Sequence, residues 1–444
     1  MDSRNASEDR VDVVGTVLAA ESSREARRDY LVEQSVLNGR VEISGAKNSA
    51  LRLLAASLLT SEEVVLHNFP HGLLDAQVHL GMLEVLGKSW ERVGDALVVT
   101  ERDERPTVLT WEGRSIRNTL LILGALTTRR GEGTVPSPGG CDLGDRKYDL
   151  HELVLRALGA TVTDDGAALS ATAVGPRLVG ADIVLPIRST GATENAILCG
   201  ALAEGTTRVW NPHVRPEILD LIRMLRGMGA RINVFGQERL EIEGVDRLRG
   251  VEHRVVADNM EALTWLVGAV VTGGDVEIAG FPFAHLEVPL IHLRESGARF
   301  FAGEDSIIVR GGRPLPVEIA TGAYPGINSD MQPLFAAYAA FARGRSRIVD
   351  LRFPGRYQYA TELSRLGAAV RTEDNVLTID GAGGTDILGT EVTASDLRAG
   401  VALTIIGWGA TSGVTTIHDA WQVERGYNGF VEKATNLGAR IEAR

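Results

Sequence analysis

Amphipathic helices that end in glycine recur along the chain at a nearly constant interval. Their closing glycines are 72, 70, 68, 70 and 71 residues apart, at Gly87, Gly159, Gly229, Gly297, Gly367 and Gly438. Glycine commonly follows a helix because it adopts the left-handed backbone conformation without strain. The spacing therefore predicts six structural repeats of about 70 residues each.

A second helix, apolar on almost all sides, precedes each of these by about half a repeat. The six predicted ranges are 46–59, 117–128, 193–203, 260–271, 331–342 and 397–407. Because helices without a polar face belong in a protein interior, an open solenoid would leave them exposed. We expect each repeat to run strand, buried helix, strand, outer helix, strand, strand. Three repeats around shared buried helices, in each of two domains, satisfy both the burial and the length of 444 residues.

The midpoint between the third and fourth repeats predicts the domain boundary, near Val255–Asp258. We expect a flexible leader over residues 1–29 and a first domain over residues 46–255. The second domain would contain residues 30–45 together with 256–444. In that arrangement a single N-terminal strand over 30–44 joins the second domain, and the chain crosses between domains twice.

Charge and composition indicate which classes of ligand, metal site and cellular compartment suit this protein. A net charge of −12 argues against a general nucleic-acid binder, although a local arginine cluster could still hold a small anion. Two cysteines, Cys141 and Cys199, form neither a disulfide framework nor a metal-ligand pattern. The chain has no apolar run of about 18 residues, and its polar N-terminus has no signal-peptide core. These features predict a cytoplasmic protein without a membrane span or a metal.

Candidate chemistry first appears in the glycine-rich segment from Pro138 to His151, Pro-Gly-Gly-Cys-Asp-Leu-Gly-Asp-Arg-Lys-Tyr-Asp-Leu-His. Nearby cations lower the pKa of a thiol, so Arg146 and Lys147 could make Cys141 an acid or a nucleophile. Glycine amides and cations also suit an anionic ligand. From this segment alone, a surface turn with an incidental cysteine remains the alternative.

Six short motifs resemble, in order, those of the enolpyruvyl transferases. They are Ile43-Ser-Gly-Ala-Lys47-Asn48, Pro138-Gly-Gly-Cys141, Gly191-Ala-Thr-Glu-Asn195, Asp330-Met-Gln, Asp396-Leu-Arg398-Ala and Arg425-Gly-Tyr427. The resemblance extends from about Leu31 to the C-terminus and is closer to the MurA-like UDP-N-acetylglucosamine 1-carboxyvinyltransferases than to EPSP synthase. It implies an inside-out α/β barrel in each of two domains. It also implies enolpyruvyl transfer from phosphoenolpyruvate, a reaction of the EC 2.5.1 class, without metal or cofactor.

The resemblance implies roles for individual residues. Asp330 would be the base at the acceptor hydroxyl, although its place before an apolar helix also suits an N-cap. Cys141 would be the acid near the methylene carbon or the covalent partner of phosphoenolpyruvate, and Lys47 would hold the phosphate. The implied phosphoenolpyruvate-binding cations are Lys47, Arg117, Arg146, Arg356, Arg398 and Arg425. Taken singly, each arginine could equally be a solvated surface residue.

The acceptor side departs from the family pattern by gaining cations and an aromatic ring. Lys147 and Tyr148 stand where the family has proline and valine, and Arg188 and Arg352 stand at apolar positions. The expected acceptor-binding residues are Asn48, Lys147, Tyr148, Asp149, His151, Arg188, Ser189, Gly191, Arg352 and Phe353.

The added cations favour an acceptor that ends in a phosphate dianion. We therefore expect the 3′-hydroxyl of UMP as acceptor, as in nikkomycin- and polyoxin-type nucleoside antibiotic pathways. UDP-N-acetylglucosamine, the acceptor in peptidoglycan synthesis, is the alternative. A non-catalytic paralogue that binds uridine nucleotides is a third hypothesis, which the complete set of acid, base and phosphate-binding residues disfavours.

Overall fold

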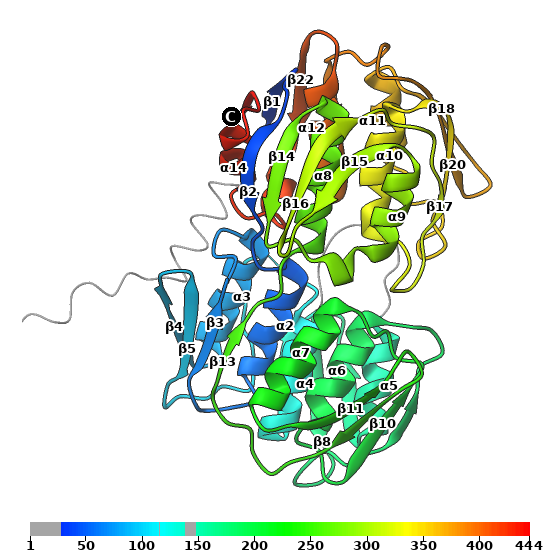
Figure 1. Cartoon of the computed structure of the whole chain (residues 1–444). Helices are drawn as coiled ribbons and strands as arrows, with labels where there is room; N and C mark the ends of the chain where they lie inside the picture. The colour runs from blue at the N-terminus through cyan, green and yellow to red at the C-terminus, as the bar shows by residue number, and fades with distance from the viewer. Residues whose placement is uncertain (1–27, 115, 138–147) are drawn as a thin grey trace, which may run out of the picture.

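The structure is a computed structural model that describes residues 28–114, 116–137 and 148–444 (Figure 1). It contains two hydrophobic cores. One is built from residues between 50 and 255, and the other combines residues 30–43 with residues between 260 and 439. The N-terminal strands accordingly lie beside the C-terminal half of the chain in Figure 1.

Three buried helices occupy the centre of each core. In the first they are α2 (Lys47–Ser57), α4 (Thr119–Arg130) and α6 (Thr190–Gly200). In the second they are α8 (Asn259–Thr272), α10 (Gln332–Ala340) and α12 (Leu397–Gly409). Within each core these helices contact one another, and the six predicted buried helices are confirmed to within a few residues. Several begin at side-chain caps: Asp258 and Asp396 each accept two backbone N–H groups at the start of α8 and α12.

Outer helices complete the repeats. They are α3 (Leu74–Val85), α5 (Asp149–Ala157), α7 (Pro216–Gly227), α9 (Glu287–Glu295), α11 (Ala360–Arg365) and α14 (Phe430–Asn436). Each is followed by one of the six evenly spaced glycines, and all six have φ between 84° and 103°. Only glycine adopts that conformation routinely, which explains the recurrence of this residue after each outer helix.

In the described part of the chain, six sheets cover the buried helices, and five of them share one topology. In the sheet β11-β12-β10-β9, β9 (Asp182–Val184) pairs parallel with β10 (Thr206–Trp210), and β12 (Arg239–Glu243) pairs antiparallel with both β10 and β11 (Arg231–Phe235). The first domain also contains β13-β3-β5-β4, built from β3 (Val64–His67), β4 (Lys88–Val93), β5 (Ala96–Glu101) and β13 (Val251–Arg254). Its third sheet, β6-β8-β7, is built from β6 (Glu132–Pro136), β7 (Ala160–Asp164) and β8 (Ala168–Ala173).

The second domain repeats the four-stranded arrangement three times. The first sheet, β15-β16-β14-β2, contains β2 (Asn38–Glu42), β14 (Asp275–Ala279), β15 (Ala298–Ala302) and β16 (Ser306–Gly312). The second, β17-β18-β20-β19, contains β17 (Glu318–Ala320), β18 (Arg343–Val349), β19 (Ala369–Glu373) and β20 (Val376–Ala382). The third, β21-β22-β1-β23, contains β1 (Tyr30–Glu33), β21 (Glu391–Thr393), β22 (Val414–His418) and β23 (Ile441–Ala443). Helices inside and sheets outside make this the predicted two-domain inside-out α/β fold.

The prediction of one continuous strand over 30–44 was wrong. Instead, β1 pairs with β22 and β23, whereas β2 pairs with β14 in a different sheet. The chain must leave one sheet and enter the next between them, and Gly39, the second residue of β2, has a φ of 118°. The two passages between the cores then lie side by side, because Gly45 and Ala257 form an antiparallel bridge.

Candidate active site

A cavity of about 800 Å³ lies between the two cores and is lined by residues from both. Twelve of the expected site residues line it: Lys47, Asn48, Arg117, Asp149, His151, Arg188, Ser189, Gly191, Asp330, Arg352, Phe353 and Arg425. Expected residues Cys141, Arg146 and Lys147 lie outside the residues that the structure describes. The cavity is large enough for a nucleotide and phosphoenolpyruvate together, since ligand pockets commonly measure roughly 300–1,000 Å³.

Asp75, at the start of α3, joins cations from the two domains. Its Oδ2 lies 2.6 Å from Lys47 Nζ, and its Oδ1 lies 3.2 Å from Arg425 Nε. Burial alone would raise the pKa of Asp75, but the charges of Lys47 and Arg425 outweigh it and lower that pKa. Asp75 also lines the cavity, so this carboxylate and its two cations form one wall.

Asp330 lies at the centre of a second charged group. Its Oδ1 accepts a hydrogen bond of 2.8 Å from Arg356 Nη1, and its Oδ2 lies 3.5 Å from Arg398 Nε. Burial would raise the pKa of Asp330, but Arg356 and Arg398 outweigh it and hold that pKa far below its usual range. The carboxylate is therefore ionised at neutral pH. Asp330 lines the cavity, whereas its partners Arg356 and Arg398, both expected at the site, are not among the lining residues.

Arg356 and Arg398 retain unused hydrogen-bonding capacity. Among the described residues, Nε of Arg356 and both Nε and Nη1 of Arg398 are buried without a hydrogen-bond partner. Buried donors are normally paired. Such guanidinium nitrogens are suited to bind an anion that reaches them, although Arg398 Nε also lies 3.5 Å from Asp330 Oδ2.

The acceptor side contains a half-buried histidine, His213, between the domains. His213 Nδ1 lies 2.9 Å from Thr190 Oγ1, and the backbone N–H of Tyr324 donates to His213 Nε2 over 3.3 Å. Because Nε2 accepts, the proton of the neutral ring is on Nδ1 and is donated to Thr190. Burial, followed by the charges of Arg215, Arg352 and Arg188, lowers the pKa of His213 to about 4.

His151 packs against the start of α6. A Cβ atom at Gly191 would lie 2.7 Å from His151 Nε2, so this close approach requires glycine. Burial and the charge of Arg117 lower the pKa of His151 to about 3, and the ring is neutral at physiological pH. Its Nδ1 lies 3.4 Å from Asn195 Nδ2.

Tyr148 does not line the cavity, although we expected it at the acceptor. Its ring packs against the first core, and its hydroxyl donates to Asp164 on β7. Three cavity residues that the sequence analysis missed are Asp75, His213 and Arg215. Only the apolar helix start near Asp75 and the His-Val-Arg-Pro run before α7 could have drawn attention to them.

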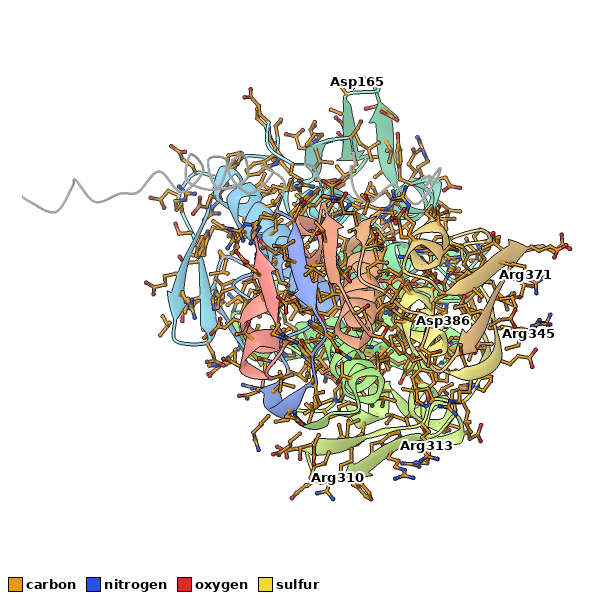
Figure 2. The ribbon with its side chains drawn as sticks, turned by 90° about the horizontal axis from the view of Figure 1, so that it is seen from above. Asp165, Arg310, Arg313, Arg345, Arg371 and Asp386 are labelled. Carbon is orange, nitrogen blue, oxygen red and sulfur yellow. The ribbon has the colours of Figure 1, made fainter. Side chains whose placement is uncertain are left out.

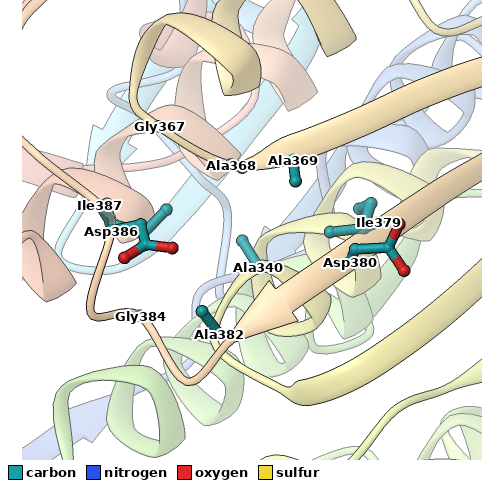
Figure 3. Close-up of a pocket in the computed structure, with 10 residues that line it drawn as sticks. All are labelled: Ala340, Gly367, Ala368, Ala369, Ile379, Asp380, Ala382, Gly384, Asp386 and Ile387. Atoms are coloured by element: carbon teal, nitrogen blue, oxygen red, sulfur yellow. The ribbon is translucent and has the colours of Figure 1, made fainter.

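Other charged groups are less suited to a substrate. Arg345 on β18 and Arg371 on β19 extend away from the body in Figure 2, and Arg345 pairs with the partly exposed Asp380 at 2.7 Å. A second recess is lined by Gly367, Asp380 and Asp386, among others (Figure 3), but it encloses only about 10 Å³, enough for one water molecule. Among the described residues, no group of three or more His, Cys, Asp or Glu side chains could hold a metal ion.

The sequence profile of the EPSP synthase (3-phosphoshikimate 1-carboxyvinyltransferase) family matches residues 32–434. This chain belongs to that enolpyruvyl transferase family. It is 39% identical over 415 residues to the UDP-N-acetylglucosamine 1-carboxyvinyltransferase of Sphingopyxis alaskensis, covering 91% of this chain and 96% of the relative. The corresponding protein of Mycolicibacterium paratuberculosis is 37% identical, with coverage of 94% and 99%.

Solved structures show the same architecture. The enolpyruvyl transferase NikO from Streptomyces tendae superposes with a TM-score of 0.83 at 26% identity, covering 94% of this chain and 99% of NikO. EPSP synthase from Acinetobacter baumannii superposes with a TM-score of 0.71 at 20% identity, covering 94% of this chain and all of that one. The protein is therefore an enolpyruvyl transferase, an enzyme of the EC 2.5.1 class. Within the described part of the chain, no helix is both long and apolar enough to cross a membrane.

Proposed function

We propose that this enzyme transfers the enolpyruvyl group of phosphoenolpyruvate to the 3′-hydroxyl of UMP and releases phosphate. The observation that carries this choice is a surplus of positive charge at the acceptor side of the cavity. Arg188 and Arg352 both line the cavity, and neither has a carboxylate partner among the described residues. Both arginines also act on the same imidazole, His213, from opposite domains.

Four other cations that line the cavity do pair with carboxylates. Lys47 and Arg425 share Asp75, Arg52 pairs with Glu194 at 2.6 Å, and Arg215 pairs with Glu217 at 2.8 Å. A phosphate monoester carries about two negative charges and accepts several hydrogen bonds, which matches two guanidinium groups. The 5′-phosphate of UMP would therefore lie between Arg188 and Arg352.

Phosphoenolpyruvate would bind on the other side of Asp330. The unpaired nitrogens of Arg356 and Arg398 support this assignment, because the substrate brings a phosphate and a carboxylate. Lys47 and Arg425 form the adjoining wall and would contact the phosphate. The proposed phosphoenolpyruvate-binding cations also include Arg117, which lines the same cavity, and Arg146, which lies outside the described residues.

The reaction is an addition followed by an elimination. Asp330 would accept the proton of the 3′-hydroxyl as its oxygen attacks C2 of phosphoenolpyruvate, while the methylene carbon C3 gains a proton from an acid, proposed to be Cys141. The resulting tetrahedral ketal loses a proton from C3 and the phosphate from C2, which leaves the enol ether. Arg356 and Arg398 would stabilise the charge that develops on the phosphate and carboxylate.

UDP-N-acetylglucosamine is the second candidate acceptor. It is favoured by the names of the relatives at 39% identity, which cover 91% of this chain. It carries a diphosphate diester and so lacks the terminal dianion that Arg188 and Arg352 would attract. NikO, the structural neighbour with a TM-score of 0.83, is named as an enolpyruvyl transferase without its acceptor. The UMP reading would assign this chain to nikkomycin- or polyoxin-type nucleoside antibiotic synthesis.

Phosphate release with phosphoenolpyruvate and either UMP or UDP-N-acetylglucosamine tests the proposal. We expect turnover of UMP, and a tenfold to hundredfold rise in its KM in Arg352→Ala, because a hydrogen bond to a charged group contributes about 1.5–3 kcal/mol. The KM for phosphoenolpyruvate should stay nearly unchanged. Arg345→Ala, an exposed arginine of the same domain, is the control. Turnover of UDP-N-acetylglucosamine with none of UMP would overturn the acceptor and leave enolpyruvyl transfer intact.

A further inference from the structure

The carboxylate of Asp350, directly after β18, is fully buried and surrounded by hydrogen-bond donors. Its Oδ1 accepts from Thr321 Oγ1 at 2.8 Å and from the backbone N–H groups of Arg352 and Phe353 at 2.9 and 2.8 Å. Its Oδ2 accepts from Ser329 Oγ at 2.5 Å and from Gln332 Nε2 at 3.3 Å. Among the described residues, all five direct hydrogen-bond donors to this carboxylate are uncharged groups.

The backbone of Asp350 is held as well. Its N–H donates to the hydroxyl of Tyr357 at 2.8 Å, and its carbonyl accepts from Asn375 Nδ2 at 3.0 Å. With both the main chain and the side chain fixed, Asp350 is a rigid reference point behind the cavity wall.

The Oδ1 atom orients the acceptor wall, by which we mean the part of the cavity lining formed by Thr321, Arg352 and Phe353. Its bonds to the N–H groups two and three residues ahead close a tight turn, which directs Arg352 and Phe353 to the cavity. Thr321 lines the same wall, and its hydroxyl is used twice. It donates to Asp350 and accepts from the Leu351 N–H at 3.1 Å. Because its proton is already donated, the Thr321 hydroxyl cannot serve as a donor to substrate.

The Oδ2 atom leads to the charged group at Asp330. Ser329 donates its proton to Asp350, and its oxygen accepts a 3.0 Å hydrogen bond from Arg356 Nη1. The same nitrogen donates to Asp330 Oδ1 at 2.8 Å. A continuous series of hydrogen bonds thus joins Asp350 to Asp330 through Ser329 and Arg356.

We propose that Asp350 is a positioning residue that sets both substrates relative to each other, one through each carboxylate oxygen. Oδ1 fixes the acceptor wall, and Oδ2 fixes Arg356, the proposed phosphoenolpyruvate ligand, beside the base. This inference rests on the proposed roles of Arg352, Arg356 and Asp330, but not on which nucleotide is the acceptor. Because both binding sites are fixed by one rigid carboxylate, the acceptor hydroxyl stays within attacking distance of C2 of phosphoenolpyruvate. The addition step requires this geometry.

Substitutions that remove hydrogen bonds to one carboxylate oxygen at a time test whether Oδ1 serves the acceptor and Oδ2 serves phosphoenolpyruvate. Thr321→Val removes the Thr321 bond to Oδ1 and the acceptor of the Leu351 N–H, while the Oδ1 bonds to the Arg352 and Phe353 N–H groups remain. Ser329→Ala removes the link from Oδ2 to Arg356, while the Gln332 bond to Oδ2 remains. We expect Thr321→Val to raise the KM of the acceptor about tenfold and Ser329→Ala to raise that of phosphoenolpyruvate about tenfold, each leaving the other KM within about twofold. Asp350→Asn should raise both. Thr321→Ser, which keeps the hydroxyl, should retain the wild-type acceptor KM.

The measurements use the full chain, with the wild type first assayed on UMP and on UDP-N-acetylglucosamine. The variants are then assayed with whichever nucleotide is turned over, so a wrong acceptor leaves this test intact. Asp380→Asn, a partly exposed aspartate in the same domain, is the matched control. If Asp350→Asn does not fold, Thr321→Val and Ser329→Ala still test the proposal. Equal changes of the two KM values within Thr321→Val or within Ser329→Ala, or lower melting temperatures with unchanged KM values, would reduce Asp350 to a structural residue and overturn the proposal.

Discussion

Replacing Asp75 by asparagine would remove the carboxylate that joins Lys47 to Arg425. The side chains involved are almost fully buried, with exposed fractions of 5% for Asp75, 10% for Lys47 and 7% for Arg425. Asparagine has nearly the same shape, so the change removes charge rather than volume. Two cations from different domains would then face each other without the anion that separates them.

The expected loss of stability follows from this burial. Breaking a buried ion pair by removing one partner costs about 3–5 kcal/mol. We take the lower figure because asparagine retains a carbonyl oxygen that can still accept a hydrogen bond. For a domain of about 200 residues, a loss of about 3 kcal/mol lowers the melting temperature by roughly 6–12 °C.

An anion in the cavity should restore part of this loss, because it supplies the missing negative charge between Lys47 and Arg425. Thermal unfolding with increasing inorganic phosphate, and separately with phosphoenolpyruvate, measures the effect. Ligand binding stabilises the native state by an amount that rises with the logarithm of the ligand concentration relative to Kd, and we expect a larger shift in Asp75→Asn than in the wild type. Asp103→Asn, an exposed aspartate of the same domain, is the control.

The reasoning would be refuted by an Asp75→Asn variant that melts like the wild type. It would also be refuted by equal phosphate-dependent shifts in the two proteins. Either result would mean that Lys47 and Arg425 do not depend on Asp75 for compensation.

Two further predictions concern the thiols and three histidines whose pKa values are lowered by burial. Fosfomycin should alkylate Cys141 and not Cys199, because Cys199 is fully buried and burial raises the pKa of its thiol to about 12. Mass spectrometry of the wild type and of Cys141→Ser checks this expectation, and adducts on Cys199 would contradict it. Burial lowers the pKa of His79 and His151 to about 3 and that of His213 to about 4. The unfolded chain, with histidine pKa values near 6.5, therefore binds about three more protons as pH falls below that value, so the free energy of unfolding should drop by up to about 4 kcal/mol per pH unit between pH 6 and 5. Urea unfolding at pH 7, 6 and 5 measures this slope, and equal stability at all three would contradict it.

The sequence by itself determined the repeat, the helices and the family. Buried helices such as α8 and α12 are recognisable because their residues are apolar on every side, a property that needs no knowledge of neighbours. The glycines after the outer helices are equally local signals, since the backbone conformation they allow is a property of the single residue. Motifs around Lys47, Asp330 and Arg398 belong to the same class, because each is short and continuous.

Only the tertiary structure decided how the charges are paired. Asp75 meets Arg425 across 350 positions of sequence, and nothing near Asp75 marks it as a partner. Asp350 reads as one more polar residue after a strand until packing surrounds it with five donors. Tyr148 was expected at the acceptor, but its hydroxyl donates to Asp164 on a neighbouring strand. The physical reason is the same in each case: the partner of a charged or polar group depends on which distant segments the folded domains bring within hydrogen-bonding distance.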